Sequence, residues 1–151
     1  MSLPRLNFPH YDFRLRGNNP RPEIFDEVRK KWVTLTPEEW VRQHAVKWVI
    51  EEKKYPASLL AIEKSIAVNG LVKRCDIVAF DRSGIPLLIV ECKAHDVVIS
   101  QHVFDQAARY NMTLNVNLFL LTNGMNHFCC VADHEKQSYA FLKELPAFPN
   151  L

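Results

Sequence analysis

The chain has 151 residues, of which 48% are hydrophobic and 24% are charged, and its formal net charge is +2. This balance is ordinary for one soluble globular domain, and two domains would be cramped in this length. No apolar run approaches the roughly 20 residues that a membrane helix needs, and the N-terminus lacks a signal-peptide core, so we expect a cytoplasmic protein. The four cysteines show no CxxC spacing, which favours buried thiols over a zinc site or disulfides.

Residues 1–35 are expected to form an arm that packs on a main domain at residues 36–151. Apolar and charged side chains alternate over residues 11–16, which predicts a short half-buried strand. Residues 1–54 hold 11 Lys and Arg against 8 Asp and Glu. This surplus could supply phosphate contacts, although a solvated basic face explains it equally well.

A helix is predicted from Pro37 to about Glu52. Thr36 suits the N-cap position, Pro37 suits the first turn, and Glu39 completes a capping box. Pro56 ends the pattern because proline cannot continue a helix. The three strands that follow are predicted at residues 61–68, 71–80 and 86–93.

The last of these strands, residues 86–93, is so apolar that we expect a central position covered on both faces. Ser100 can cap a second helix that runs from Gln101 to Asn111 or Leu114. Further strands are predicted at residues 117–122, 126–131 and 139–142. A strand, a helix and a strand in succession favour a right-handed parallel crossover. The order is helix, three-strand meander, helix and strand pair, which predicts an α/β fold with a mixed sheet.

Three polar residues stand out in the central hairpin. Glu91 and Lys93 lie two residues apart on one strand, so their side chains point to the same face. Asp76 lies on the preceding antiparallel strand, and the turn places it opposite Ile89 or Glu91. In either register Asp76 shares the face of the other two, within reach across the strands. Two carboxylates and one ammonium group are therefore expected to converge.

Such a patch in an apolar strand favours a metal site. Buried charges are costly unless they are paired or bound to metal, and two close carboxylates repel each other. Mg²⁺ removes both problems because it prefers one or two carboxylates, waters and phosphate oxygens. The backbone carbonyl of Cys92 is a further candidate ligand, and Lys93 could orient or deprotonate an attacking water. A structural salt bridge at a strand end remains the alternative.

The E-x-K pattern alone is weak because the chain contains it three times. Two copies, at residues 51–53 and 52–54, lie at the polar end of the predicted helix, where a solvated charge cluster explains them. Only Glu91-Cys92-Lys93 lies in an apolar strand with an Asp on the strand before it. The context of the third copy, rather than the pattern, indicates a site.

With this spacing the chain resembles the PD-(D/E)xK nuclease superfamily, and more narrowly the N-terminal nuclease domain of type I restriction enzyme R subunits. The resemblance covers roughly residues 36 to 145. It is carried by Pro37–Gln43, Cys75-Asp76, Ile89–Lys93, Gln106–Tyr110 and Thr122–Gly124. The proline of the superfamily's name is replaced by Cys75, a position without chemistry.

The resemblance implies a restriction-endonuclease-like mixed sheet flanked by helices, and cleavage of DNA with Mg²⁺ or Mn²⁺. Asp76 and Glu91 would bind the metal, and Lys93 would be the catalytic lysine. Gln106 and Tyr110 match the Q-x-x-x-Y motif of that branch and could contact DNA, although Tyr110 also fits an apolar core stripe. Glu39 is a candidate metal ligand on the first helix, in competition with its capping role, and Glu63 is a weaker one.

The chain has no G-x-x-x-x-G-K-[ST] loop, so we expect no ATP site in it, and any motor or specificity subunit would be a separate partner. One site per chain also makes a homodimer conceivable. The main hypothesis is a metal-dependent DNA endonuclease. A non-cleaving nucleic-acid binding or assembly module with the same fold is the alternative, and a structural domain with paired charges is the third.

Overall fold

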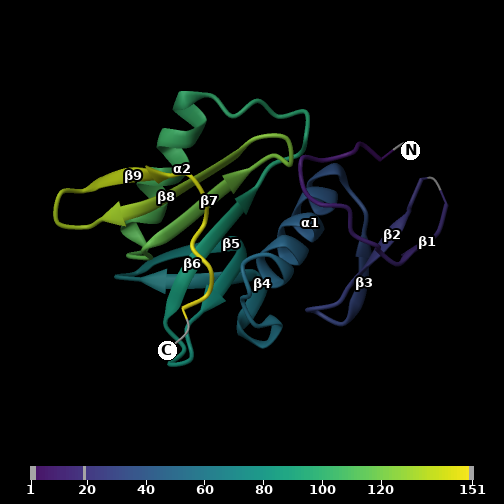
Figure 1. Cartoon of the computed structure of the whole chain (residues 1–151), viewed down its shortest axis with the longest axis horizontal. Helices are drawn as coiled ribbons and strands as arrows, with labels where there is room; N and C mark the ends of the chain where they lie inside the picture. The colour runs from purple at the N-terminus through teal and green to yellow at the C-terminus, as the bar shows by residue number, and fades with distance from the viewer. Residues whose placement is uncertain (1–2, 19, 150–151) are drawn as a thin grey trace.

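The computed structural model describes residues 3–18 and 20–149 and has an α/β architecture (Figure 1). Within these residues the chain forms a six-stranded mixed sheet, a separate three-stranded antiparallel sheet and two α-helices. The predicted fold class is therefore confirmed. The outer ends of the two predicted ranges, 1–35 and 36–151, lie outside the described residues.

The N-terminal sheet is antiparallel and is formed in order by β1 (Leu15–Arg16), β2 (Glu23–Asp26) and β3 (Lys31–Thr34). The strand predicted at residues 11–16 is shorter than expected, because only its last two residues join the ladder. Phe13 instead packs on the rings of Trp40 and His44, with centroid distances of 5.2 and 4.8 Å. Aromatic packing on the first helix replaces strand pairing in this segment.

The first helix, α1 (Pro37–Glu51), begins as the sequence predicts. The hydroxyl of Thr36 accepts a hydrogen bond from the backbone N–H of Glu39 at 3.0 Å. The side chain of Glu39 turns away from this cap and accepts hydrogen bonds from Arg42 and Gln43. Only the N-cap half of the predicted capping box is therefore present, and the Glu39 carboxylate binds side chains one turn further along α1 instead.

The main sheet has the strand order β4-β5-β6-β7-β8-β9, with β6 and β7 parallel and the other neighbours antiparallel. A short 3-10 turn, η1 (Ala57–Leu59), precedes it. Its elements are β4 (Leu60–Val68), β5 (Leu71–Phe80), β6 (Pro86–Cys92), α2 (Gln101–Thr113), β7 (Leu118–Thr122), β8 (His127–Asp133) and β9 (Ser138–Leu142). The predicted meander and the predicted parallel crossover through α2 are both confirmed.

The two helices cover opposite faces of the main sheet, which gives two apolar layers. The layer on the α1 side includes Val41, Ala45, Ile77, Leu88 and Val90. The layer on the α2 side includes Val78, Ile89, Phe104, Ala108 and Phe119. Since the consecutive residues 88–90 of β6 are all fully buried, the predicted central position of this strand is confirmed.

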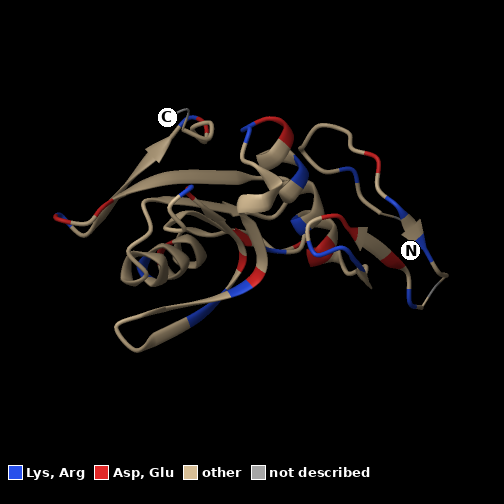
Figure 2. Ribbon diagram, turned by 90° about the horizontal axis from the view of Figure 1, so that it is seen from below, with Lys and Arg blue, Asp and Glu red and all other residues tan. Residues whose placement is uncertain are grey.

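The position of α1 determines where polar groups meet. In Figure 1, α1 lies between the main sheet and the N-terminal sheet. Figure 2 shows acidic and basic residues gathered at this junction, whereas most of the main sheet carries neither. The two sheets therefore meet through charged side chains at the start of α1.

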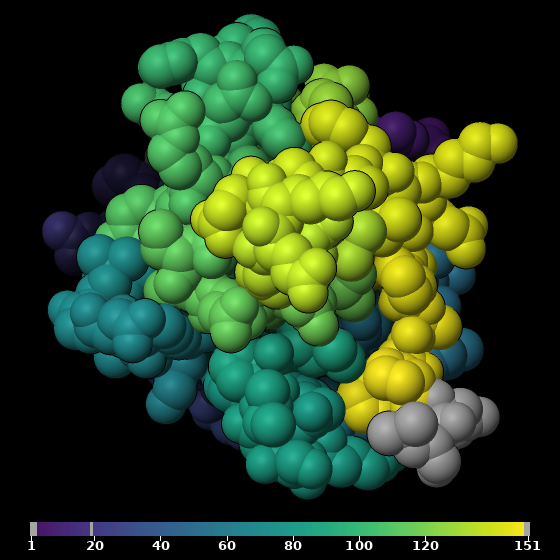
Figure 3. Space-filling view, turned by 90° about the vertical axis from the view of Figure 1, so that its left-hand side faces the viewer, coloured from purple at the N-terminus to yellow at the C-terminus, as the bar shows by residue number. Residues whose placement is uncertain are grey.

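Both ends of the described chain are tied to the domain. The backbone N–H of Asn7 donates to the carbonyl of Gly124 at 2.7 Å. Near the other end, the N–H of Phe148 donates to the carbonyl of Lys53 at 2.7 Å, and the Arg82 guanidinium lies 5.3 Å from the Phe148 ring. Figure 3 shows this C-terminal segment along the side of the molecule, next to the β5–β6 turn.

The four cysteines are free and buried, as the sequence predicts. Within the part of the chain that the structure describes, neither helix has the length and apolar character needed to span a bilayer.

Candidate active site

The polar residues of the central hairpin lie where β5 and β6 stop pairing. The last paired residues at this end of the ladder are Ile77 and Val90. Continuing this register places Asp76 opposite Glu91, one of the two partners that the sequence allowed. The N–H of Cys92 donates to Oδ2 of Asp76 at 2.7 Å, so a side chain replaces the next backbone bond of the ladder.

Asp76 is held from two directions. Its Oδ2 accepts from Cys92, and its Oδ1 accepts from Nη2 of Arg42 on α1 at 3.0 Å. Its side chain is 14% exposed, so these two bonds fix a largely buried carboxylate. Each oxygen has a further lone pair that could bind a cation.

Glu91 has a different partner. Its Oε1 lies 2.9 Å from Nζ of Lys73, two residues before the buried Cys75 on β5. Burial raises the pKa of Glu91, the Lys73 ammonium opposes this rise, and the charge of Asp76 adds to it. Lys73 also lies 4.9 Å from the ring centroid of Tyr110 on α2. Lys73 was not predicted as a site residue, because the only indication in the sequence is its position on the same strand as Asp76.

Lys93 follows β6 directly, and its backbone N–H donates to the carbonyl of Thr122 at 2.8 Å. Its ammonium lowers the pKa of both Glu38 and Glu91, although other causes keep the pKa of each above its usual value. Lys93 is therefore close to both carboxylates. Among the described ion pairs none includes Lys93, which leaves its ammonium available to a ligand.

The start of α1 presents two carboxylates in different directions. Glu39 is buried and accepts from Arg42 at 2.7 Å, from Gln43 at 3.0 Å and from Arg29 at 3.3 Å. Glu38 is half exposed and shares Nη2 of Arg42 with Asp76, at 3.6 and 3.0 Å. Burial first and then the charge of Asp76 raise the pKa of Glu38. Consecutive helical residues lie about 100° apart, so only one of the pair can face Asp76.

The two α2 residues of the Q-x-x-x-Y motif are both exposed and lie one turn apart. Tyr110 is 39% exposed, so the interpretation of this residue as a core aromatic is wrong. Its contact with Lys73 places it beside the Lys73–Glu91 ion pair. Gln106 is next to Tyr110 on the same helix face, facing solvent.

Asp76 and Lys93 thus both affect the pKa values of Glu38 and Glu91, but these four residues do not share one set of contacts. Within residues 3–18 and 20–149, no three His, Cys, Asp or Glu side chains come close enough together to hold a metal ion by themselves. Any metal site here would use two carboxylates at most, together with backbone carbonyls and water, which is a ligand set that Mg²⁺ accepts.

An open polar hollow lies next to this group, between the N-terminal sheet and the start of α1. Its volume is about 520 Å³. One wall is formed by Lys31–Thr34 of β3, and the other includes Glu38, Arg42 and Glu63. The N-terminal sheet therefore borders the site as well as packing on the domain.

Comparisons with known proteins identify the family and the fold. The family model described as "Type I restriction enzyme R protein N terminus" matches residues 37–146. The chain is also similar in fold to a solved fragment described as an HsdR subunit of a type I restriction enzyme from Vibrio vulnificus YJ016. The TM-score is 0.51 at 19% sequence identity, over 75% of this chain and 24% of that one. No curated protein matches the chain.

The chain thus spans about a quarter of the length of that solved structure. The family match covers both helices and the whole main sheet, and with them Glu38, Asp76, Glu91 and Lys93. The chain belongs to the family of type I restriction enzyme R protein N termini.

Proposed function

We propose that the chain is a metal-dependent nuclease that hydrolyses phosphodiester bonds in DNA, with Asp76, Glu91 and Lys93 as its catalytic residues. The observation that carries the proposal is the position of these residues. Two carboxylates and an ammonium group that is in none of the described ion pairs lie together at the end of a buried central β-ladder. Family membership is consistent with this chemistry.

The donor set suits a hard divalent cation. Carboxylate oxygens of Asp76 and Glu91, with the backbone carbonyl of Cys92, are oxygen ligands of the kind that Mg²⁺ and Mn²⁺ take. Burial raises the pKa of Glu91, which means that its carboxylate is poorly solvated, and a bound cation would supply oxygen-ligand contacts that the buried charge lacks. When bound, the metal would stabilise the charge that develops on the phosphate.

The remaining residues have distinct roles in the proposal. Lys93 orients the attacking water and takes part in its deprotonation. Glu38 replaces Glu39 as the helix carboxylate nearest the metal, because Glu39 is committed to Arg29, Arg42 and Gln43. The exposed side chains of Tyr110 and Gln106 contact the DNA backbone.

DNA is proposed as the substrate on the basis of the family and of the exposed arginines on the N-terminal sheet, which include Arg14 and Arg16. The family makes a motor or specificity subunit a proposed partner, and a homodimer is a second route to cutting both strands.

One observation favours the alternative, a nucleic-acid binding or assembly module that does not cleave. Asp76 is already paired with Arg42, and Glu91 with Lys73, so both carboxylates have a positive partner without any metal. In that case the site would be a charge-balanced remnant of the nuclease fold. Salt-dependent DNA binding without cleavage would be its signature.

The test is cleavage of supercoiled, linear and single-stranded DNA by the purified chain with Mg²⁺ or Mn²⁺, and with EDTA. Lys93→Ala removes the catalytic ammonium, whereas Lys64→Ala removes an exposed lysine of β4 and serves as the matched control. Cleavage that requires metal, is lost in Lys93→Ala and is retained in Lys64→Ala would support the nuclease. Equal activity in wild type and Lys93→Ala would refute it.

A further inference from the structure

The turn between β2 and β3 fixes one arginine in a defined conformation. Asp26, which is fully buried, accepts from the backbone N–H groups of Val28 and Arg29 through Oδ1, at 2.9 and 2.8 Å. Its Oδ2 accepts from Nε of Arg29 at 2.6 Å. The Asp26 carboxylate therefore holds both the backbone and the guanidinium of Arg29, and the two Nη groups of Arg29 point at the main domain.

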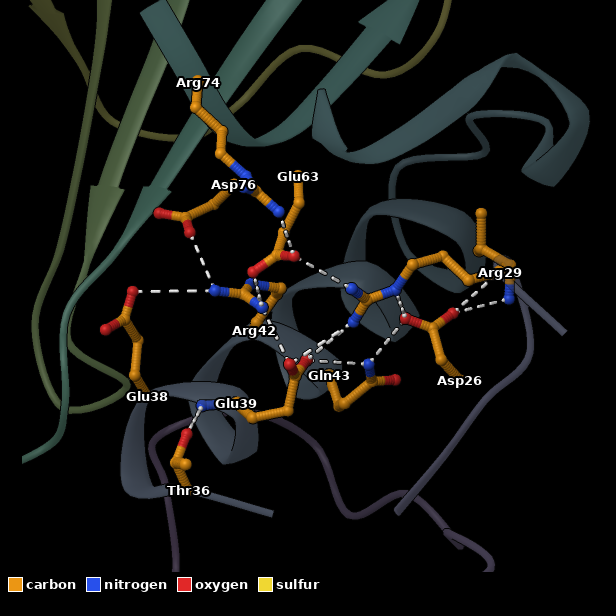
Figure 4. A network of polar contacts seen from close by, with 11 residues as sticks. Asp26, Arg29, Thr36, Glu38, Glu39, Arg42, Gln43, Glu63, Arg74 and Asp76 are labelled. Carbon is orange, nitrogen blue, oxygen red and sulfur yellow. Dashed lines mark hydrogen bonds and ion pairs between the residues drawn. The ribbon is translucent and has the colours of Figure 1, made fainter. Parts of the chain in front are cut away.

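Arg29 then contacts two carboxylates of the main domain (Figure 4). It donates to Glu39 on α1 and to Glu63 on β4, each at 3.3 Å. The same two carboxylates accept from Nη1 of Arg42, at 2.7 and 3.2 Å. Arg42 in turn donates through Nη2 to Asp76 at 3.0 Å. A continuous series of charged contacts thus joins the N-terminal sheet to Asp76.

The backbone of β4 is distorted where this series passes through it. Glu63 has a φ of +52°, which is unusual for a non-glycine residue and costly within a strand. Ile62 and Lys64 pair with Ile77 and Cys75, but Glu63, which would face Asp76, is absent from the ladder. Such a conformation persists only where the surroundings enforce it.

Three arginines provide that enforcement, since Glu63 accepts from Arg29, Arg42 and Arg74. The interactions of Arg29 and Arg42 are largely buried, with side-chain exposures of 14% and 7%. Charges in such surroundings have few alternative partners, so the removal of one leaves the others poorly compensated. The conformation at Asp76 is therefore coupled to the presence of Arg29.

We propose that Arg29 and Arg42 are positioning residues for Asp76. Through Arg29, the N-terminal sheet helps to orient the Asp76 carboxylate in the active site. Arg42 orients the carboxylate of Asp76 directly. Arg29 acts through Glu39 and Glu63, which hold Arg42 in place. An effect of Arg29 on catalysis rests on the proposed nuclease function, whereas its effect on the orientation of Asp76 does not.

One backbone amide reports on this positioning without any metal or DNA. The N–H of Cys92 donates to Asp76, whereas the adjacent N–H of Lys93 donates to the carbonyl of Thr122. Hydrogen exchange of both amides can be followed by NMR on the ¹⁵N-labelled full chain. A general loss of stability would accelerate hydrogen exchange of both amides alike, whereas a loss of the Asp76 orientation would accelerate exchange of the Cys92 amide selectively.

The variant is Arg29→Met, and the matched control is Arg16→Met. Arg16 lies on the same N-terminal sheet and pairs with Glu23 at 2.9 Å, outside the series of contacts to Asp76. In Arg29→Met we expect the ratio of Cys92 to Lys93 exchange rates to rise about tenfold or more. In Arg29→Lys, which keeps the charge, we expect a smaller rise of the same ratio. Arg16→Met should leave the ratio unchanged.

An unchanged ratio in folded Arg29→Met would overturn the proposal. If circular dichroism shows that Arg29→Met does not fold, Glu63→Gln removes the charge between Arg29 and Arg42 at a partly exposed side chain, and the same selective rise is expected. An unchanged ratio in Glu63→Gln would then be the contradicting result.

A kinetic measurement separates this inference from the proposed function. If the wild type cleaves DNA, Arg29→Met should lower kcat about tenfold and change KM less than about twofold, because Arg29 acts on the reacting centre and not on DNA binding. If the wild type cleaves nothing, the proposed function fails, and the exchange ratio still decides whether Arg29 positions Asp76.

Discussion

Asp26→Asn tests how strongly the N-terminal sheet is held to the domain. The Asn side chain can still accept from the two backbone N–H groups through its oxygen. Its amide nitrogen, however, would face Nε of Arg29 and Nε2 of Gln43, which now donate to Oδ2 at 2.6 and 3.0 Å. The new amide N–H groups would then point at two other donors, from Arg29 and Gln43. The Arg29 guanidinium is largely buried, so it has few other partners.

The expected cost follows from these contacts. A charge-assisted hydrogen bond contributes about 1.5–3 kcal/mol and a second bond to the carboxylate about 1–2 kcal/mol, so Asp26→Asn should lower the free energy of unfolding by about 3–5 kcal/mol near pH 7. Urea denaturation followed by tryptophan fluorescence measures this difference. Asp12→Asn, at a fully exposed carboxylate, is the control and should change stability by less than about 0.5 kcal/mol.

The pH dependence of the stability difference between the wild type and Asp26→Asn gives a second test. Burial would raise the pKa of Asp26, but the hydrogen bonds from Arg29 and Gln43 outweigh it, so the pKa lies below its ordinary 3.8. The stability due to this charge is therefore present above about pH 3.8 and is lost as the pH falls through the lowered pKa. Wild type and Asp26→Asn should converge in acid. A difference below about 1 kcal/mol near pH 7, or one that persists in acid, would refute this reasoning.

Three further perturbations test other parts of the structure. Glu91→Gln should abolish cleavage, and it should be more stable relative to the wild type at pH 8 than below pH 4.5, because burial raises the pKa of Glu91 and the stability that its protonated form contributes is lost as the pH rises through that pKa; the same stability difference at both pH values in urea denaturation would contradict this. Gly124→Ala should cost about 1–3 kcal/mol in thermal unfolding, because φ is +85° and the new Cβ would lie 2.9 Å from Leu6; a cost below about 0.5 kcal/mol would argue against it. Burial lowers the pKa of His127, whose ring bridges Thr122 and the carbonyl of Asn7, so the stability of the wild type should fall as the pH drops below about 6.5. Urea denaturation across pH should show a smaller fall in His127→Gln, and an equal fall in both proteins would exclude His127 as the cause.

Local patterns predicted most of the fold because they are strong in this chain. The apolar run of β6 required burial on both faces, and the Asn69-Gly70 turn determined the pairing of β4 and β5. The hydroxyl of Thr36 fixed the start of α1. These features depend on neighbours within a few residues, which a sequence displays directly.

The arrangement of charges around Asp76 could not be predicted in the same way. Arg42 is 34 residues from Asp76, and Arg29 is 34 residues from Glu63, so these contacts exist only because α1 packs between the two sheets. The capping pattern drew attention to Glu39, although its neighbour Glu38 faces Asp76. A one-residue choice on a helix depends on tertiary packing, which no local pattern contains.

Asp76 and Glu91 have different partners in the structure, and the proposed mechanism requires that one divalent cation bring them together. Calorimetric titration of the wild type with Mn²⁺, beside Asp76→Asn and Glu91→Gln, tests this directly. We expect one Mn²⁺ per chain in the wild type and a loss of affinity of about tenfold or more in each variant, because both carboxylates would bind the same ion directly. A wild type that does not bind Mn²⁺, or variants that bind it as the wild type does, would contradict the proposed metal site.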